Sequence, residues 1–365
     1  MSASASDVIS LASGYSYFPT PPLVLEQLQP YLQGSKLPDS PAAGLPELRQ
    51  VLARQYAAGQ VSPDQVVVTA GAKSALYAVL RAVIRPGDEV LLPTPNWFGF
   101  DALVAEAGGI LKQLPLSPDD NYSLSPAALG AALTPRTRVF LFSNPCNPTG
   151  RIYSHQELEA LLHITGQHPR LLVISDEIYN LVSFGPPVPS LLDFPDPQQQ
   201  HIVVNGFSKS LALINWGLGY LVAPQPLAQE CTRWQHATSG AVASLNQLAG
   251  LAAARNASTI ATDLVAQLQP LRQLMLSLLQ DIPGVGLTPT EGTYYTFPDF
   301  RAFLNPDLPP EAASQALTSR LRAAGVEVVD GASCHAPGFA RLSCAVPEPE
   351  LRTGLARLRD ALLAR

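Results

Sequence analysis

The stretch "HIVVNGFSKSLALINWGLGYLVAP" at residues 201–224 decides the fold. It contains two short apolar runs, "HIVVNGF" and "LGYLVAP", in which polar and apolar residues do not alternate. Such runs are typical of strands that are buried on both faces of a sheet. Directly after the first run comes Lys209, and the chain has only three other lysines. The stretch therefore predicts a buried strand that ends beside a scarce cationic side chain.

Four more runs of the same kind precede this stretch. They read "QVVVTAG" (65–71), "DEVLLPTP" (88–95), "RVFLFSNP" (138–145) and "LLVISDE" (171–177), and the longer segments between them can hold helices. This alternation predicts an α/β fold with a layered core. Leucine and tyrosine residues at helical spacing predict amphipathic helices in residues 43–56 and 349–365.

The rhythm of strands and loops changes after residue 260. A long helix rich in leucine and glutamine is predicted over residues 262–280, followed by shorter elements. We therefore predict an N-terminal arm and part of a small domain at 1–40, a large domain at 41–260, and a small C-terminal domain at 261–365.

Composition restricts the class of function. The 365-residue chain has a net charge of −6, which gives no electrostatic attraction to nucleic acid or to an anionic membrane surface. The first residues lack the basic and apolar regions of a secretory signal, and no apolar run is long enough to span a membrane. The four cysteines lack CxxC spacing, which argues against a metal site and a disulfide framework. These features favour a cytoplasmic protein that acts on small molecules.

Polar side chains follow the predicted strands where an open α/β sheet places its chemistry. Gly71, Ala72 and Lys73 stand between a strand and a helix, where backbone N–H groups and a cation can bind phosphate. The next strands end in Asn147, in Asp176 with Tyr179 one helical turn later, and in Ser208 with Lys209.

Each motif also has a simpler interpretation. Asp176 suits a helix N-cap, and "NPCNPTG" suits a proline-rich turn. A nucleotide-binding P-loop is excluded because Ala72 stands where the GK[ST] motif needs glycine. The hydrolase motif GxSxG is excluded because Ser210 occupies its last position.

Taken together, the order and spacing of these motifs resemble the pyridoxal-phosphate-dependent aminotransferases of class I/II, which have fold type I. The resemblance runs from "FPTP" and "AAGLPELR" through "GDEVLLPTPNWFGF", "NPCNPTG", "DEIY" and "SK" to "ARLSCAVPEPEL". It implies a large domain with a mostly parallel seven-stranded sheet flanked by helices, a smaller α+β domain, and a homodimer.

The resemblance implies a role for each cofactor-binding residue. Lys209 holds pyridoxal 5'-phosphate as a Schiff base and moves a proton, a reaction that suits a lysine of lowered pKa. Asp176 keeps the pyridine nitrogen protonated. Asn147 and Tyr179 contact the phenolic oxygen, and Trp97 stacks on the ring. Phosphate binding falls to the turn that contains Gly71, Ala72 and Lys73, together with Ser208.

The same resemblance assigns the substrate side of the site. Arg341 matches the arginine that binds the α-carboxylate, a task suited to a bidentate guanidinium. Gly14 and Asn147 also match substrate-binding positions. The alternative for Arg341 is an exposed arginine at the start of a strand.

Two positions depart from the family pattern. Gly217 stands where the family has an arginine that binds the cofactor phosphate, so weaker cofactor retention is expected. Asp39 stands where a tyrosine commonly reaches the cofactor of the partner subunit. We hypothesise that Asp39 selects an amino acid with a cationic side chain; the alternative is that it caps a turn or faces solvent.

The sequence thus predicts an aminotransferase that passes an α-amino group from an amino acid to a 2-oxo acid. One alternative is a lyase or cyclase that acts on a substituted, arginine-derived amino acid, because both reactions begin with loss of the same Cα proton. A second alternative is a non-catalytic member that binds the cofactor without turnover.

Overall fold

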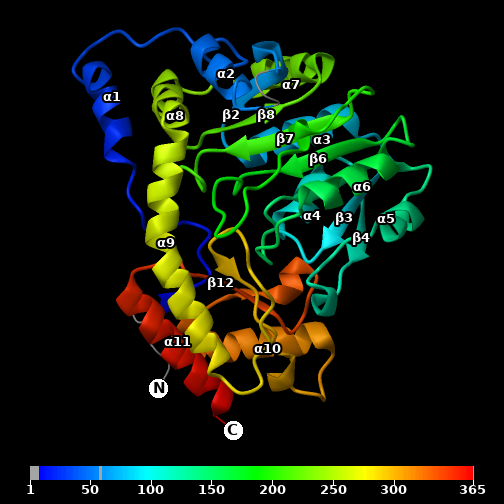
Figure 1. The fold of residues 1–365 in the computed structure, drawn as a ribbon, viewed down its shortest axis with the longest axis vertical. Helices are drawn as coiled ribbons and strands as arrows, with labels where there is room; N and C mark the ends of the chain where they lie inside the picture. Colours follow the sequence, from blue (N-terminus) through cyan, green and yellow to red (C-terminus); the bar gives the residue numbers. More distant parts are fainter. Residues whose placement is uncertain (1–7, 57–59, 365) are drawn as a thin grey trace.

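A seven-stranded sheet forms the centre of the protein, whose computed structural model describes residues 8–56 and 60–364. Only β8 runs antiparallel to its neighbours in this sheet, so the predicted α/β fold with a mostly parallel sheet is confirmed (Figure 1). In spatial order the strands are β2 (Val66–Thr69), β8 (Gly219–Val222), β7 (His201–Gly206), β6 (Leu172–Asp176), β5 (Thr137–Ser143), β3 (Glu89–Thr94) and β4 (Ile110–Pro115).

Helices cover both faces of this sheet. Phe140 and Phe142 of β5 pack on one face in a core that includes α2, α6 and α8, whereas Val139 and Leu141 pack on the other face against α3, α4 and α7. This arrangement explains why the strands read as continuous apolar runs. The helices are α1 (Pro22–Leu32), α2 (Pro46–Ala53), α3 (Ala72–Val83), α4 (Gly99–Glu106), α5 (Pro126–Ala132), α6 (His155–Thr165), α7 (Gln225–Thr238), α8 (Ser244–Arg255), α9 (Ala257–Gln280), α10 (Pro310–Ala323) and α11 (Glu348–Leu363).

All six apolar runs form strands of this sheet, but β4 was not predicted from the sequence. It lies at the edge of the sheet, and most of its side chains are exposed. β4 lacks a continuous apolar run because its side chains are largely exposed, whereas β2, at the other edge of the sheet, is buried along its whole length. The two predicted amphipathic helices are confirmed as α2 and α11, and the leucines that were predicted to face the core are buried.

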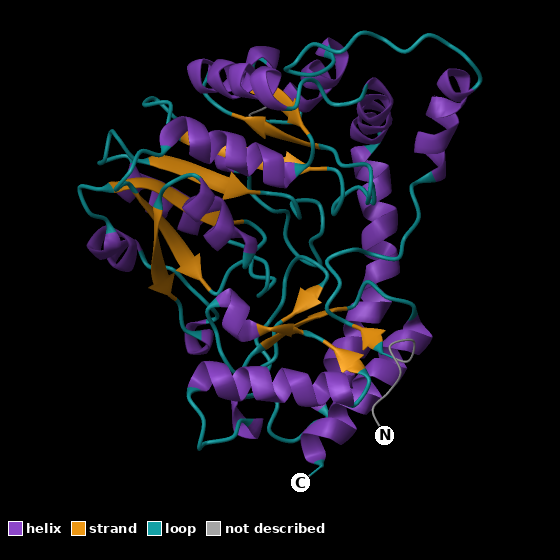
Figure 2. Cartoon of the chain, turned by 180° about the vertical axis from the view of Figure 1, so that it is seen from behind, coloured by secondary structure: helices purple, strands orange, loops and turns teal. Residues whose placement is uncertain are grey.

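A second core surrounds α9, α10 and α11. Small sheets lie beside these helices: β9 (Tyr295–Thr296), β11 (Val329–Asp330) and β12 (Ala340–Ser343) form one, and β1 (Ile9–Ser10) pairs with β10 (Val326–Glu327). Figure 2 shows α9 running past both groups of strands. The predicted domain boundary at residue 260 falls near the start of α9. The division into two domains stays a prediction.

The N-terminal segment contributes to both cores. Leu11 is buried beside α11 and the small strands, while Val24 and Leu28 of α1 are buried in the core of the large sheet. The segment predicted as an arm therefore also supplies core side chains. In the described part of the chain, no helix is both long and apolar enough to cross a bilayer.

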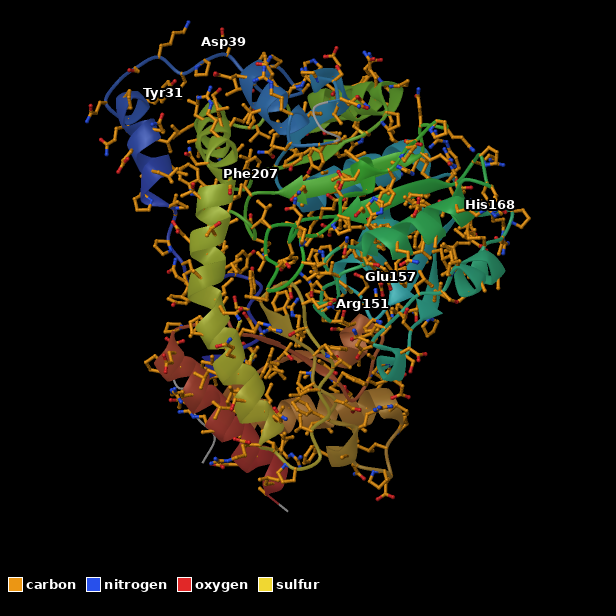
Figure 3. The ribbon with its side chains drawn as sticks, in the orientation of Figure 1. Tyr31, Asp39, Arg151, Glu157, His168 and Phe207 are labelled. Atoms are coloured by element: carbon orange, nitrogen blue, oxygen red, sulfur yellow. The ribbon has the colours of Figure 1, made fainter. Side chains whose placement is uncertain are left out.

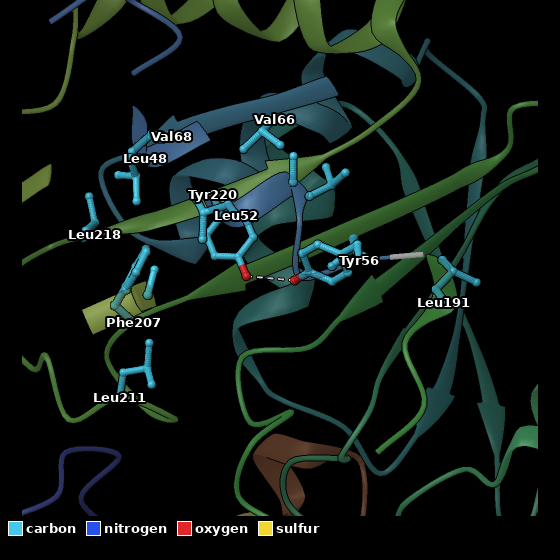
Figure 4. Close-up of a cluster of buried hydrophobic side chains, with 14 of the residues drawn as sticks. Leu48, Leu52, Tyr56, Val66, Val68, Leu191, Phe207, Leu211, Leu218 and Tyr220 are labelled. Carbon is cyan, nitrogen blue, oxygen red and sulfur yellow. Dashed lines mark hydrogen bonds between the residues drawn. The ribbon is translucent and has the colours of Figure 1, made fainter. Parts of the chain in front are cut away.

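A polar cluster inside the large core joins α2 to the strands on either side of the lysine loop. Tyr56 Oη and Tyr220 Oη lie 2.8 Å apart (Figure 4). Asn205 Nδ2 donates to Tyr56 Oη at 3.1 Å. Burial raises the pKa of both tyrosines, so they stay neutral hydrogen-bonding groups. The cluster fixes β7 and β8, and hence the two ends of the loop that carries Lys209.

The backbone of β8 touches the N-terminal end of α3 at Gly219. A Cβ atom at Gly219 would lie 2.3 Å from the backbone nitrogen of Ala72 and 2.4 Å from the carbonyl carbon of Gly71. Only glycine permits this approach, because both neighbouring atoms belong to the backbone. Nearby Gly217 has a φ of +57°, but a Cβ there would have no neighbour within 4 Å.

These two glycines give a matched test of the close approach. We expect Gly219→Ala to lower the free energy of unfolding by about 2–3 kcal/mol, because the backbone must shift to relieve the overlap. Gly217→Ala should cost only about 1 kcal/mol, because its penalty comes from the positive φ alone. Chemical denaturation measures both free energies of unfolding. Equal losses in the two variants would contradict the proposal that the close backbone approach at Gly219 requires glycine.

Candidate active site

A cavity of about 470 Å³ opens at the carboxyl ends of the parallel strands. Its lining comes from the end of β5 at Ser143, the end of β6 at Asp176, and the loop after β7 at Lys209. Residues of the N-terminal segment and of β12 close it from the other side. A larger cavity of about 990 Å³ lies beside Phe207, Ser210 and α9, but none of the predicted site residues lines it.

The smaller cavity brings together nearly every predicted site residue. Its lining includes Gly14, Gly71, Ala72, Lys73, Trp97, Asn147, Asp176, Tyr179, Ser208, Lys209 and Arg341. Asp39 is the exception, because it is exposed on the connection between α1 and α2 and does not line this cavity (Figure 3).

Lys209 has the surroundings expected of a reactive amine. Its Nζ donates to the carbonyl oxygen of Gly14 and lies 4.7 Å from the centre of the Tyr15 ring. Burial, assisted by the positive charge of Arg341, lowers the pKa of Lys209 to about 8. Roughly a tenth of this amine is therefore uncharged at pH 7, far more than for an ordinary lysine, and the uncharged form is the one that can act as a nucleophile.

Asp176 is a buried carboxyl at the floor of the cavity. One of its oxygens accepts a hydrogen bond from the backbone N–H of Ile178 at 3.3 Å, as a residue at the start of a turn does. Burial raises its pKa to about 7 despite this hydrogen bond. A cation placed against the carboxyl would favour its ionised form, so Asp176 is suited to bind a buried N–H⁺ group.

Arg341 lies buried at the substrate side of the cavity and not at an exposed strand end. It donates to Asn147 Oδ1 at 3.1 Å and to the carbonyl oxygen of Ala12 at 2.9 Å, and its guanidinium lies 4.2 Å from the centre of the Tyr295 ring. Its Nε has no hydrogen-bond partner among residues 8–56 and 60–364. A buried guanidinium held by neutral groups is strongly stabilised by a carboxylate, which the fork can bind with two hydrogen bonds.

The N-terminal end of α3 forms a third side of the cavity. Gly71 is the N-cap of α3, and Lys73 Nζ lies 5.3 Å from the centre of the Trp97 ring. Trp97 in turn packs edge to face on Phe100 with ring centres 5.2 Å apart. Backbone N–H groups, a nearby cation and a fixed aromatic ring are the features that bind a phosphorylated planar molecule.

Sequence reasoning missed several aromatic residues of the cavity. Tyr295 lines the cavity and shares a hydrogen bond of 2.8 Å with Tyr179. Tyr294 does not line it but donates to the carbonyl oxygen of Gly14, which does, at 2.8 Å. Tyr15 and Phe98 also line the cavity. The only hint of Tyr294 and Tyr295 in the sequence is the segment "EGTYYTF" at 291–297, which places two tyrosines together after a glycine. Nothing in the sequence indicated that it folds back onto "DEIY".

Comparison with known proteins identifies the family. The family model described as "Aminotransferase class I and II" matches residues 6–358. The chain is 31% identical to a probable aspartate/prephenate aminotransferase of Aquifex aeolicus, covering 98% of this chain and 91% of that protein. It is 30% identical to the aspartate aminotransferase of Geobacillus stearothermophilus, covering 100% of this chain and 94% of that protein.

Solved structures agree with the sequence relatives. The aspartate aminotransferase from Thermus thermophilus with maleate superposes with a TM-score of 0.89 at 31% identity, covering 97% of this chain and 92% of that chain. The match therefore extends over both cores and over every element that lines the cavity. This chain belongs to the class I and II aminotransferases, pyridoxal-phosphate-dependent transferase enzymes with fold type I.

Proposed function

We propose that this chain binds pyridoxal 5'-phosphate at Lys209 and uses it to exchange an amino group between an amino acid and a 2-oxo acid. The observation that carries the proposal is the grouping in one cavity of an amine with lowered pKa, a buried carboxyl and a buried guanidinium held by neutral groups. The donor set fits the cofactor. Lys209 suits its aldehyde, Asp176 its ring nitrogen, and the N-terminal end of α3 with Ser208 its phosphate.

The bound cofactor supplies an electron sink that makes the substrate Cα–H acidic. The protein residues then hold and move protons around it. Lys209 Nζ would be the base that takes the proton from the substrate Cα and the acid that returns it to C4′ of the bound cofactor. Asp176 would bind the protonated ring nitrogen in its ionised form, and the Tyr179 hydroxyl and the Asn147 amide would donate to the phenolic oxygen.

Substrate orientation falls to Arg341. Its guanidinium binds the α-carboxylate shared by amino acids and 2-oxo acids, which explains how one site serves both halves of the reaction. The Tyr295 ring and the carbonyl of Ala12 hold the guanidinium in place. Gly14 leaves room near the reacting amine, because a Cβ there would lie 3.3 Å from Tyr295 Oη and 3.6 Å from Lys209 Nζ.

The proposed amino donor is an acidic amino acid. Relatives at about 30% identity carry the names aspartate and aspartate/prephenate aminotransferase. Among the described residues that line the cavity, Asp176 is the only carboxylate, so a cationic substrate side chain finds no counter-charge within one chain. The alternative of an arginine-derived substrate rests on Asp39, which would have to act in the site of a partner subunit.

We further propose a homodimer in the cytoplasm, with the large and small domains divided near residue 260. The family resemblance supports the dimer, and the exposed position of Asp39 outside its own cavity agrees with a role at a subunit boundary. Light scattering of the purified protein tests the oligomeric state.

The reaction is tested by titrating the cofactor-loaded protein with aspartate, glutamate and arginine while recording the cofactor absorbance. We expect aspartate or glutamate to convert the lysine-bound cofactor to its amine form, and a 2-oxo acid to reverse the change. Lys209→Ala should abolish turnover, whereas Lys112→Ala, on the edge strand β4, should leave it unchanged. Release of an unsaturated or cyclised product from arginine would instead establish the lyase alternative.

The lowered pKa of Lys209 makes the stability of the cofactor-free protein depend on pH. Between pH 8 and about 10.5 the unfolded chain binds more protons at this lysine than the folded chain, so its contribution to stability improves as pH rises. We expect Lys209→Met to raise the free energy of unfolding by about 3 kcal/mol at pH 7, with the gain vanishing above pH 10.5. Lys36→Met, at an exposed position, is the control. If the stability gained by Lys209→Met did not change with pH, the lowered pKa of Lys209 would be refuted.

Because Gly217 replaces the arginine that binds the cofactor phosphate in the family, we predict that this protein retains its cofactor weakly. We expect the wild-type protein to lose cofactor during extended dialysis, and Gly217→Arg to retain it roughly threefold to tenfold longer, because a charge-assisted contact outweighs the cost of a positive φ. The first atom of this side chain meets no overlap, since a Cβ at Gly217 would have no neighbour within 4 Å among the described residues. Gly217→Ala is the control, with the strain but without the charge. A wild-type holoenzyme that survives dialysis unchanged would contradict the prediction.

A further inference from the structure

A separate cavity of about 600 Å³ lies at the opposite edge of the sheet, where the parallel strands begin. Three arginines line it: Arg85 after α3, Arg138 at the start of β5, and Arg170 just before β6. In Figure 3, His168, two residues before Arg170, marks this outer edge of the molecule. No residue lines both this cavity and the active-site cavity.

The two acidic side chains of this cavity accept hydrogen bonds from groups other than the guanidinium groups of its three arginines. Asp88 Oδ2 accepts a hydrogen bond from the backbone N–H of Arg85 at 2.8 Å. Glu230 accepts two hydrogen bonds from Arg233, at 3.0 and 2.5 Å. Within the described residues, none of the guanidinium groups of Arg85, Arg138 and Arg170 forms an ion pair with a carboxylate. The cavity therefore has an excess of positive charge in a chain whose net charge is −6.

Backbone carbonyls hold two of the guanidinium groups in place. Arg85 Nη1 donates to the carbonyl oxygen of Ile84 at 2.9 Å, and Arg138 Nη1 donates to that of Arg170. Each contact uses one nitrogen of the guanidinium group and leaves its other nitrogens available to bind a ligand. Burial lowers the pKa of Arg138, the charge of Asp88 opposes this, and the charges of Arg170 and Arg85, each with a smaller effect than Asp88, lower it further. Arg138 therefore lies within electrostatic range of both other arginines.

We propose that this arginine cavity binds a small polyanion, either a phosphate compound or a polycarboxylate. Guanidinium groups bind the oxygens of both kinds of anion in pairs, and a multiply charged ligand offsets the repulsion among the three arginines. The ligand would bind at the amino ends of β5 and β6, whose other ends carry Ser143 and Asp176 of the active site. The proposal does not depend on the reaction assigned above.

The test is isothermal titration of the cofactor-loaded protein with inorganic pyrophosphate and, separately, with citrate, at constant ionic strength set by chloride. We expect at least one of them to bind one site per chain. The double variant Arg138→Gln, Arg170→Gln should weaken that binding by roughly tenfold or more per arginine, because each loses a charge-assisted contact. Arg320→Gln, an exposed arginine on α10 outside this cavity, is the matched control and should bind as the wild type does.

Each outcome decides the proposal. Binding of pyrophosphate alone identifies a phosphate compound as the ligand, and binding of citrate alone identifies a polycarboxylate. Absence of binding to both probes at millimolar concentration would overturn the proposal. Equal affinity in the double variant would also overturn it, because binding would then belong to another site. Circular dichroism and the absorbance of the bound cofactor check that the double variant is folded.

Discussion

The burial of two cations in one cavity is the constraint on which the rest of the structure depends. Lys209 and Arg341 lie in the same cavity, and the positive charge of Arg341 helps to lower the pKa of Lys209. The free-energy cost of burying these two charges is offset by contacts with neutral groups. These groups are the carbonyls of Gly14 and Ala12 and the rings of Tyr15 and Tyr295. A cavity arranged in this way is electrostatically prepared for anionic substrates, because ligand carboxylate and phosphate groups supply the missing charge.

The part of this arrangement that rests on the large sheet was predictable from the sequence. Buried parallel strands read as continuous apolar runs, and polar residues at their ends indicate the edge at which side chains meet. Lys209, Asp176 and Asn147 were found in this way, and the structure places all three in one cavity.

Other parts of the site were not predictable, for different physical reasons. Tyr295 reaches the cavity only through the tertiary contact of β9 with β12, which no local pattern indicates. The edge strand β4 is mostly exposed and lacks an apolar signal. Asp39 lies outside the cavity of its own chain, so a single sequence gives no position for it in the site.

The pairing of β1 with β10 also determines when the active site can form. Residues 9–15 supply the carbonyl of Gly14 and the ring of Tyr15, but β1 has no strand to pair with until residues 326–327 have been made. Arg341 follows later still. During synthesis the large sheet can assemble once residue 222 has left the ribosome, whereas the substrate side of the cavity waits for more than a hundred further residues. Contacts between such distant segments close slowly, so catalytic competence is expected to be the last property this chain acquires as it folds.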